Sequence, residues 1–141
     1  VEVSLTEILP DGSEVYVQSG WLRASHRALD ATSTELRPTH THLVDDAAPL
    51  NPPGEFDEVR VELFPFAHVF RAGSQLRLTI DAPGGDRAVW ELVTIADGEE
   101  VTIGTGGAIA SSVVLPVIPG VDAPADAPAC GSLRGQPCIP G

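Results

Sequence analysis

Glycine and proline interrupt this chain so often that a long helix has no room to form. The 141 residues include 14 Gly and 13 Pro, scattered along the whole length. Proline lacks a backbone donor and glycine is entropically costly inside a helix, so both residues break helical patterns. The chain therefore favours an all-β fold, with at most one short helical turn at residues 24–29.

Apolar side chains instead recur at every second position. Val1, Val3 and Leu5 alternate with polar residues, and Asp11-Gly12, which follows this run, is a typical hairpin turn. Such alternation gives a strand one solvated face and one buried face, which favours antiparallel sheets. The sequence predicts an antiparallel β-sandwich of the jelly-roll, galactose-binding-like type. Further runs of strand length lie at 15–17, 59–63, 76–80, 89–94 and 113–118.

Two segments depart from the strand pattern. Residues 31–55 have no periodicity and contain four prolines, so we expect a long crossover loop there. From residue 119 the composition shifts to Ala, Pro, Asp and Gly, which indicates a tail or linker. We therefore predict one β-sandwich domain over 1–118 and a tail over 119–141.

Charge excludes several function classes. The net charge is −12, and all eight basic residues are Arg. With no basic patch, we expect no contact with nucleic acid or with anionic membranes. No apolar run is long enough for a membrane helix, and no signal peptide is visible at the first residues. Because the chain opens on Val1 in mid-pattern, we expect a cut or processed fragment.

The two cysteines, Cys130 and Cys138, lie close together in the predicted tail. A metal site needs more ligands than two thiols, and no His is near them in sequence. A small disulfide loop is the favoured interpretation and would suit a secreted, extracellular protein. Two free thiols remain the alternative.

No constellation in the sequence satisfies the requirements of a catalytic or metal centre. The G-x-S-x-G elbow of serine hydrolases is absent, and adjacent side chains such as Ser25 and His26 do not normally face each other. His40 and His42 would share one face of an extended segment, but they supply only two of the three or four ligands a metal needs. Calcium ligands from Asp45, Asp46, Asp81 and Asp86 lack the spacing of a calcium loop. We predict no catalytic residue, no cofactor and no metal.

A series of motifs in this order resembles the C-terminal domain of the X-Pro dipeptidyl-peptidase and cocaine-esterase (CocE/NonD) family of serine hydrolases. The series begins with a Pro-Asp-Gly hairpin at residues 10–12 and the run Gly20-Trp21-Leu22-Arg23-Ala24. After the long loop come Val59-Arg60-Val61-Glu62-Leu63-Phe64-Pro65 and then Phe70-Arg71-Ala72-Gly73-Ser74-Gln75-Leu76-Arg77-Leu78. Many members have His after the glycine, where this chain has Ser74. The resemblance covers residues 1–118.

The resemblance implies a jelly roll that packs on an α/β-hydrolase domain and a helical cap, both outside this chain. It implies that the chain begins after the first strand or strands of the jelly roll, and that the Ser-Asp-His triad lies elsewhere. The partners expected from the resemblance are those two domains of the parent enzyme, with assembly into homo-oligomers left open. Residues predicted to contact the partner domains are Trp21, Arg23, Arg27, His40, His42, Phe66 and His68.

Two functional hypotheses follow. The first is a non-catalytic domain that braces the hydrolase and cap domains of an enzyme acting on acyl esters or on amide bonds after proline. The alternative is a free-standing carbohydrate-binding module, because Tyr16, Trp21, Phe66 and Trp90 could form an aromatic platform for a sugar.

Overall fold

The computed structural model of the chain describes residues 1–83, 100–122 and 138–139, the last two by their backbone alone. The chain divides into two compact units. The sheet unit holds the described residues 1–21, 63–83, 118–122 and 138–139, and the loop unit holds 22–62 and 100–117.

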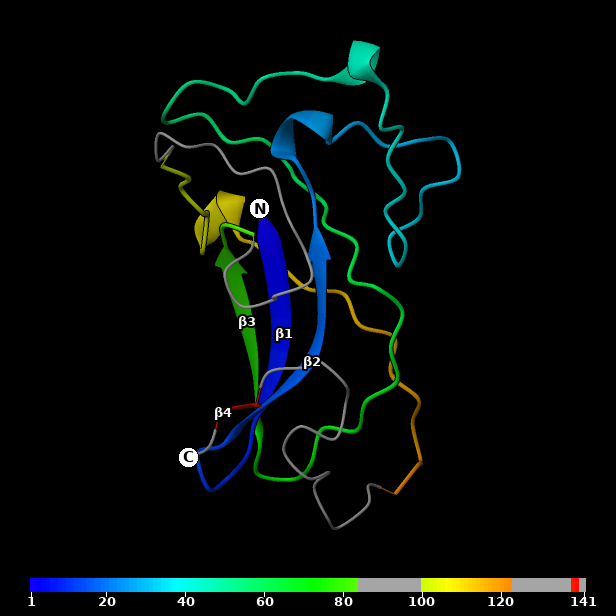
Figure 1. The fold of residues 1–141 in the computed structure, drawn as a ribbon, viewed down its shortest axis with the longest axis vertical. Coiled ribbons are helices and arrows are strands. Elements are labelled where there is room, and N and C mark those ends of the chain that lie inside the picture. The colour runs from blue at the N-terminus through cyan, green and yellow to red at the C-terminus, as the bar shows by residue number, and fades with distance from the viewer. Residues whose placement is uncertain (84–99, 123–137, 140–141) are drawn as a thin grey trace. The chain divides into compact units, whose positions relative to one another are not determined.

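The sheet unit is built on an antiparallel sheet with the strand order β3-β1-β2-β4. The strands are β1 (Glu2–Ile8), β2 (Glu14–Trp21), β3 (Gln75–Asp81) and β4 (Cys138–Ile139). Figure 1 shows β1 lying between β2 and β3. This antiparallel sheet and the near absence of helix confirm the predicted all-β class.

The predicted hairpin joins β1 to β2. Gly12 has φ of 86° and its N–H donates to the Leu9 carbonyl, while Leu9 N–H donates to the Ser13 carbonyl. Only glycine adopts this φ without strain, which explains the Asp-Gly step. The pairing of the two strands shifts register between Leu5 and Thr6, where β2 accommodates one extra residue.

Burial departs from the predicted pattern of one wet face and one buried face. Val3, Leu5 and Glu7 share one face of β1, yet Glu2 on the other face is also buried, with Tyr16 and Ser19 of β2 on that face too. β1 therefore has buried side chains on both faces, in addition to being paired with a strand at each edge. β3 is largely exposed along its length.

Two predicted strands are not strands in the structure. Residues 59–63 and 113–118 have no assigned secondary structure. Alternation and β-propensity favour an extended chain, but a strand also needs a neighbour that accepts and donates its backbone hydrogen bonds. In the described residues neither segment has such a neighbour. The predicted strand 89–94 lies outside the described residues.

The loop unit is held together by turns. Its short helices are η1 (Ala24–His26), which confirms the predicted helical turn, η2 (Val44–Asp46) and η3 (Gly107–Ile109). Leu29 and His40 form an isolated antiparallel bridge. Residues 31–55 contain no strand, as predicted.

The predicted tail is not wholly separate from the sheet. In β4, Cys138 pairs with Val15 and Ile139 pairs with Glu14 of β2. The sequence did not predict this pairing for two reasons. Residues 119–141 have low hydrophobicity, and two paired residues are too few to make a periodic pattern. Cys130 lies outside the described residues, so the predicted disulfide stays a prediction.

Candidate functional site

Glu7 is the most completely enclosed ionisable side chain that the structure describes, with no exposed surface. It projects from β1, and four groups of the segment that precedes β3 converge on its carboxylate. The His68 Nε2 atom lies 2.7 Å from Oε2, and the Arg71 guanidinium lies 3.2 Å from the same oxygen. The Arg71 backbone N–H donates to Oε1 at 2.8 Å, and the Ser74 hydroxyl donates to it at 2.6 Å. We call Glu7, His68, Arg71 and Ser74 the Glu7 cluster.

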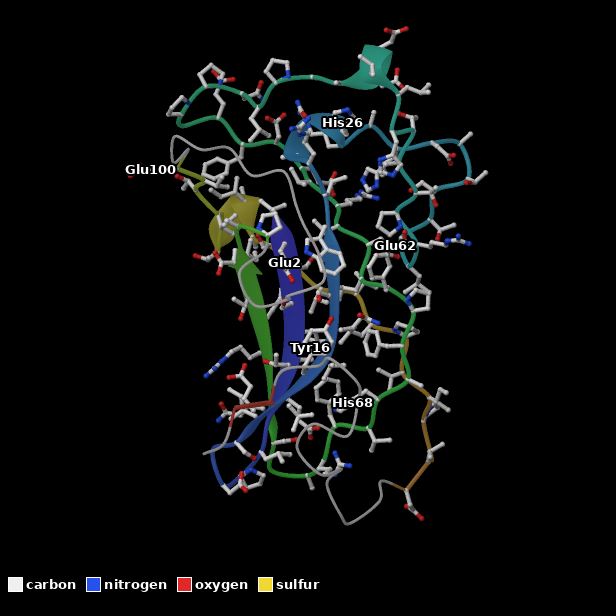
Figure 2. All side chains as sticks on the ribbon, in the orientation of Figure 1. Glu2, Tyr16, His26, Glu62, His68 and Glu100 are labelled. Carbon is white, nitrogen blue, oxygen red and sulfur yellow. The ribbon has the colours of Figure 1, made fainter. Side chains whose placement is uncertain are left out.

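A tight turn brings Arg71 and Ser74 to the same carboxylate. Ser74 N–H donates to the Arg71 carbonyl, and Gly73 has φ of 84°. Glycine tolerates this left-handed conformation, which turns the chain directly into β3. Figure 2 shows His68 on the segment that runs toward this turn.

The Glu7 cluster favours an ionised carboxylate. Burial by itself would raise the pKa of Glu7, but hydrogen bonds from Arg71, Ser74 and His68 outweigh it and lower the pKa below its ordinary value. A buried charge is tolerated when it is paired and fully hydrogen-bonded. The cluster therefore fastens residues 68–74 onto β1.

The Glu7 cluster does not form a serine nucleophile. The Ser74 hydroxyl lies 2.6 Å from the Glu7 carboxylate and 2.6 Å from the Arg71 carbonyl, and both are acceptors. His68 contacts the same carboxylate and not the hydroxyl. The base within reach of this hydroxyl is the Glu7 carboxylate, and its lowered pKa makes it a weak base, so this arrangement is suited to holding a segment and not to covalent chemistry.

The Glu7 cluster was not predicted, although the sequence contains a signal for it. Glu7 has the same parity as Val1, Val3 and Leu5, so it falls on the apolar face of β1. A carboxylate at such a position calls for buried donors. His68 was predicted to contact a partner domain, and the structure gives it a contact inside the sheet unit.

Beside the cluster, residues 64–67 form an exposed apolar segment with the sequence Phe64-Pro65-Phe66-Ala67. Phe64 is 44% exposed and Phe66 is 37% exposed. β2 holds the beginning of the segment: Phe64 N–H donates to the Ser19 carbonyl, and the Gln18 side-chain amide donates to the Pro65 carbonyl at 3.5 Å. We call residues 64–67 the apolar segment.

Trp21 and Phe64 pack against each other, with ring centroids 5.4 Å apart and planes tilted by 50°. Tyr16 is 5% exposed, and its hydroxyl shares a hydrogen bond with Ser19. Trp90 lies outside the described residues. The side chains proposed as a sugar platform are thus occupied by packing at Tyr16 and Trp21, which gives the carbohydrate alternative no support from the described residues.

The sequence argument about Ser25 and His26 was wrong on geometry. The Ser25 hydroxyl lies 3.1 Å from His26 Nδ1, because the helical turn η1 lets neighbouring side chains fold toward each other. Figure 2 labels His26 on this turn. A catalytic dyad also needs a group that orients the second ring nitrogen. No described residue is shown in that role, so the contact reads as local structure.

Arg27 is engaged within the loop unit. Its guanidinium donates to the carbonyls of Ala48 at 2.8 Å and Pro49 at 3.1 Å, and it pairs with Asp57 at 3.1 Å. Asp57 in turn accepts from the backbone and side chain of Asn51. Arg27 therefore holds residues 48–57 in place. Arg23, also predicted to face a partner, is exposed.

His40 and His42 lie near each other, with ring centroids 5.8 Å apart. His40 is 7% exposed, and burial together with His42 lowers its pKa. His42 is exposed and adopts φ of 53°, unusual for a residue other than glycine. Within the residues that the structure describes, no three His, Cys, Asp or Glu side chains are grouped to hold a metal ion.

No helix in the described part of the chain has the length and apolar character needed to cross a membrane.

With this geometry in hand, comparison with known proteins decides the family. Residues 1–113 match the family described as the X-Pro dipeptidyl-peptidase C-terminal non-catalytic domain. The chain belongs to this family. The predicted resemblance is thereby confirmed.

The family domain also has relatives among curated proteins. This chain is 35% identical over 81 residues to two proteins that are each named putative serine esterase. They come from strains of Mycobacterium bovis and Mycobacterium tuberculosis. The match covers 55% of this chain and 13% of each relative, so the chain corresponds to a small part of their length. No solved structure matches the chain significantly.

Proposed function

We propose that this chain is the non-catalytic C-terminal domain of a serine hydrolase of the CocE/NonD type, and that it braces the α/β-hydrolase and cap domains of that enzyme. The parent enzyme would cleave acyl esters or amide bonds after proline. Membership of the non-catalytic family and the similarity to two serine esterases support the proposal.

The observation that carries the bracing role is an imbalance between core and surface. Four hydrophobic side chains are buried among the described residues, whereas nineteen large ones are exposed. Scattered exposed apolar residues are normal on a soluble protein, but so many beside so small a core indicate surfaces that another domain covers. Covering them would stabilise the assembly by about 25 cal/mol for each Å² of apolar surface removed from water.

The test compares this chain with the complete polypeptide that its gene encodes. Both are treated with a fluorophosphonate probe and assayed on p-nitrophenyl esters and on X-Pro-nitroanilides. We expect the probe to label the complete polypeptide at a serine outside these 141 residues and to leave this chain unlabelled. Labelling of this chain, or a complete polypeptide with neither label nor activity, would overturn the proposal.

The bracing role needs its own measurement. Removal of this domain from the complete polypeptide should speed the thermal inactivation of the hydrolase severalfold, because its contact surfaces lose their cover. An unchanged inactivation rate would leave a serine hydrolase whose C-terminal domain does not brace it.

A further inference from the structure

We infer that the apolar segment, residues 64–67, is the surface with which this domain docks onto the catalytic part of the enzyme, and that the Glu7 cluster holds the segment in its docking position. This inference rests on the proposed function and names the surface responsible for it. The proposed occupant is an apolar patch of the hydrolase portion of the same polypeptide.

The composition of the segment is the first argument. Phe64, Pro65, Phe66 and Ala67 are four consecutive apolar residues, and all four are exposed. Such a run on a soluble surface is unfavourable unless it has a function. Aromatic side chains are also the residues that contribute most strongly to the centres of protein interfaces.

The second argument is preorganisation. Hydrogen bonds to Ser19 and Gln18 fix the beginning of the segment on β2, and the Glu7 cluster fixes the chain directly after it on β1. A segment ordered before binding loses less conformational entropy when a partner covers it. Val117 and Ile118 are more exposed, at 81% each, but no hydrogen bond fixes them in the described part of the chain.

Charge selects the occupant. Residues 63–70 contain no Asp, Glu, Lys or Arg, and the only titratable side chain in this run, His68, is engaged with Glu7. A complementary partner surface must therefore be apolar. A second copy of this chain would bring another net charge of −12 toward the first, and repulsion between like-charged surfaces opposes that pairing.

Hydroxyl-radical footprinting of phenylalanine tests the inference. Oxidation of Phe64 and Phe66 is measured by mass spectrometry in this chain and in the complete polypeptide. We expect oxidation of both to fall severalfold in the complete polypeptide. Phe56 in the loop unit is the matched internal control, since it is 43% exposed against 44% for Phe64, and its oxidation should change less.

Three outcomes would overturn the inference. Equal oxidation of Phe64 and Phe66 in both proteins would show that the catalytic part does not cover them. Low oxidation already in this chain, with a monomeric mass by light scattering, would show that the chain covers its own segment. Low oxidation with a doubled mass would assign the surface to a second copy.

A pair of variants adds a functional readout. In the complete polypeptide, F66S should raise the rate of thermal inactivation of the hydrolase severalfold, whereas F56S should leave it near the wild-type rate. Footprinting confirms that F66S still folds if the oxidation of Phe70 is unchanged. One result would refute this docking surface but not the proposed function: the probe labels the complete polypeptide, Phe64 and Phe66 are oxidised as much there as in this chain, and F66S does not raise the inactivation rate. A complete polypeptide that the probe does not label at all would refute the proposed function itself.

Discussion

At the scale of single residues, Glu7 connects distant parts of the sequence. It lies on β1, while its partners lie 61 to 67 positions later in the chain. Burying a carboxylate costs free energy. Replacing it by a neutral side chain is also costly, because its buried partners then lose the anion that they bind. The stability of the segment before β3 should therefore depend strongly on this one side chain.

The substitution Glu7→Gln tests that dependence. We expect it to lower the free energy of unfolding by about 2–3 kcal/mol, because a neutral amide cannot accept equally from His68, Arg71 and Ser74. Urea denaturation followed by tryptophan fluorescence measures the loss. Glu58→Gln is the control: Glu58 pairs with Arg60 at 2.9 Å and both side chains are exposed, at 73% and 45%, so the expected change is below about 1 kcal/mol. Equal losses in the two variants would contradict the special role of Glu7.

The same carboxylate should make stability depend on acid. The pKa of Glu7 is lower in the folded chain than its ordinary value of 4.5, so the unfolded chain binds a proton more readily. The stabilisation is complete above the ordinary value and is lost as the pH falls through the lowered one. The difference in unfolding free energy between wild type and E7Q should therefore shrink as the pH is lowered from about 7 toward 3. A difference independent of pH would mean that Glu7 is not ionised when folded.

At the scale of elements, the alternation of apolar and polar residues correctly predicted the strands that pair with a neighbouring strand. β1, β2 and β3 all contain predicted runs, and the Asp-Gly hairpin between β1 and β2 is in place. Residues 59–63 and 113–118 alternate or are apolar in the same way and yet form no strand. The pattern along one segment carries no information on whether a pairing partner exists, so this part of the fold could not be predicted.

The contacts of Arg27 were equally hidden in the sequence. Its acceptors are backbone carbonyls at residues 48 and 49, and carbonyls occur at every position, so no residue type marks them. The prediction of a partner contact rested on the side chain alone. The structure shows that the loop itself supplies three acceptors for this guanidinium.

Arg27→Lys should loosen residues 48–57 without unfolding the chain. A lysine ammonium cannot reach two carbonyls and a carboxylate with the fixed fork of a guanidinium. We expect backbone amides of this loop, with Asn51 among them, to exchange about tenfold faster in hydrogen–deuterium exchange. Arg37→Lys is the matched control, because Arg37 is 76% exposed and lies 3.6 Å from Glu62. Unchanged exchange in R27K would show that the loop does not depend on the guanidinium.

At the scale of the whole molecule, charge and apolar surface oppose each other. A net charge of −12 keeps copies apart near neutral pH, while the exposed hydrophobic side chains favour association. Light scattering should find this chain dispersed at about pH 7 and self-associated near its isoelectric point of about 4.4. The scattering of the complete polypeptide should rise less, since docking covers apolar surface. Scattering that does not depend on pH would contradict this balance.

The outer edge of β2 has a consequence for growth of the sheet. Two unrelated parts of the chain already bond to that edge: β4 at Glu14 and Val15, and Phe64 at the Ser19 carbonyl. An incoming strand would have to displace both. Sheet extension at the outer edge of β2, whether in a native assembly or in an aggregate, is thus obstructed by the chain itself. A strand from another chain would gain the backbone hydrogen bonds of this edge only after both segments had left β2.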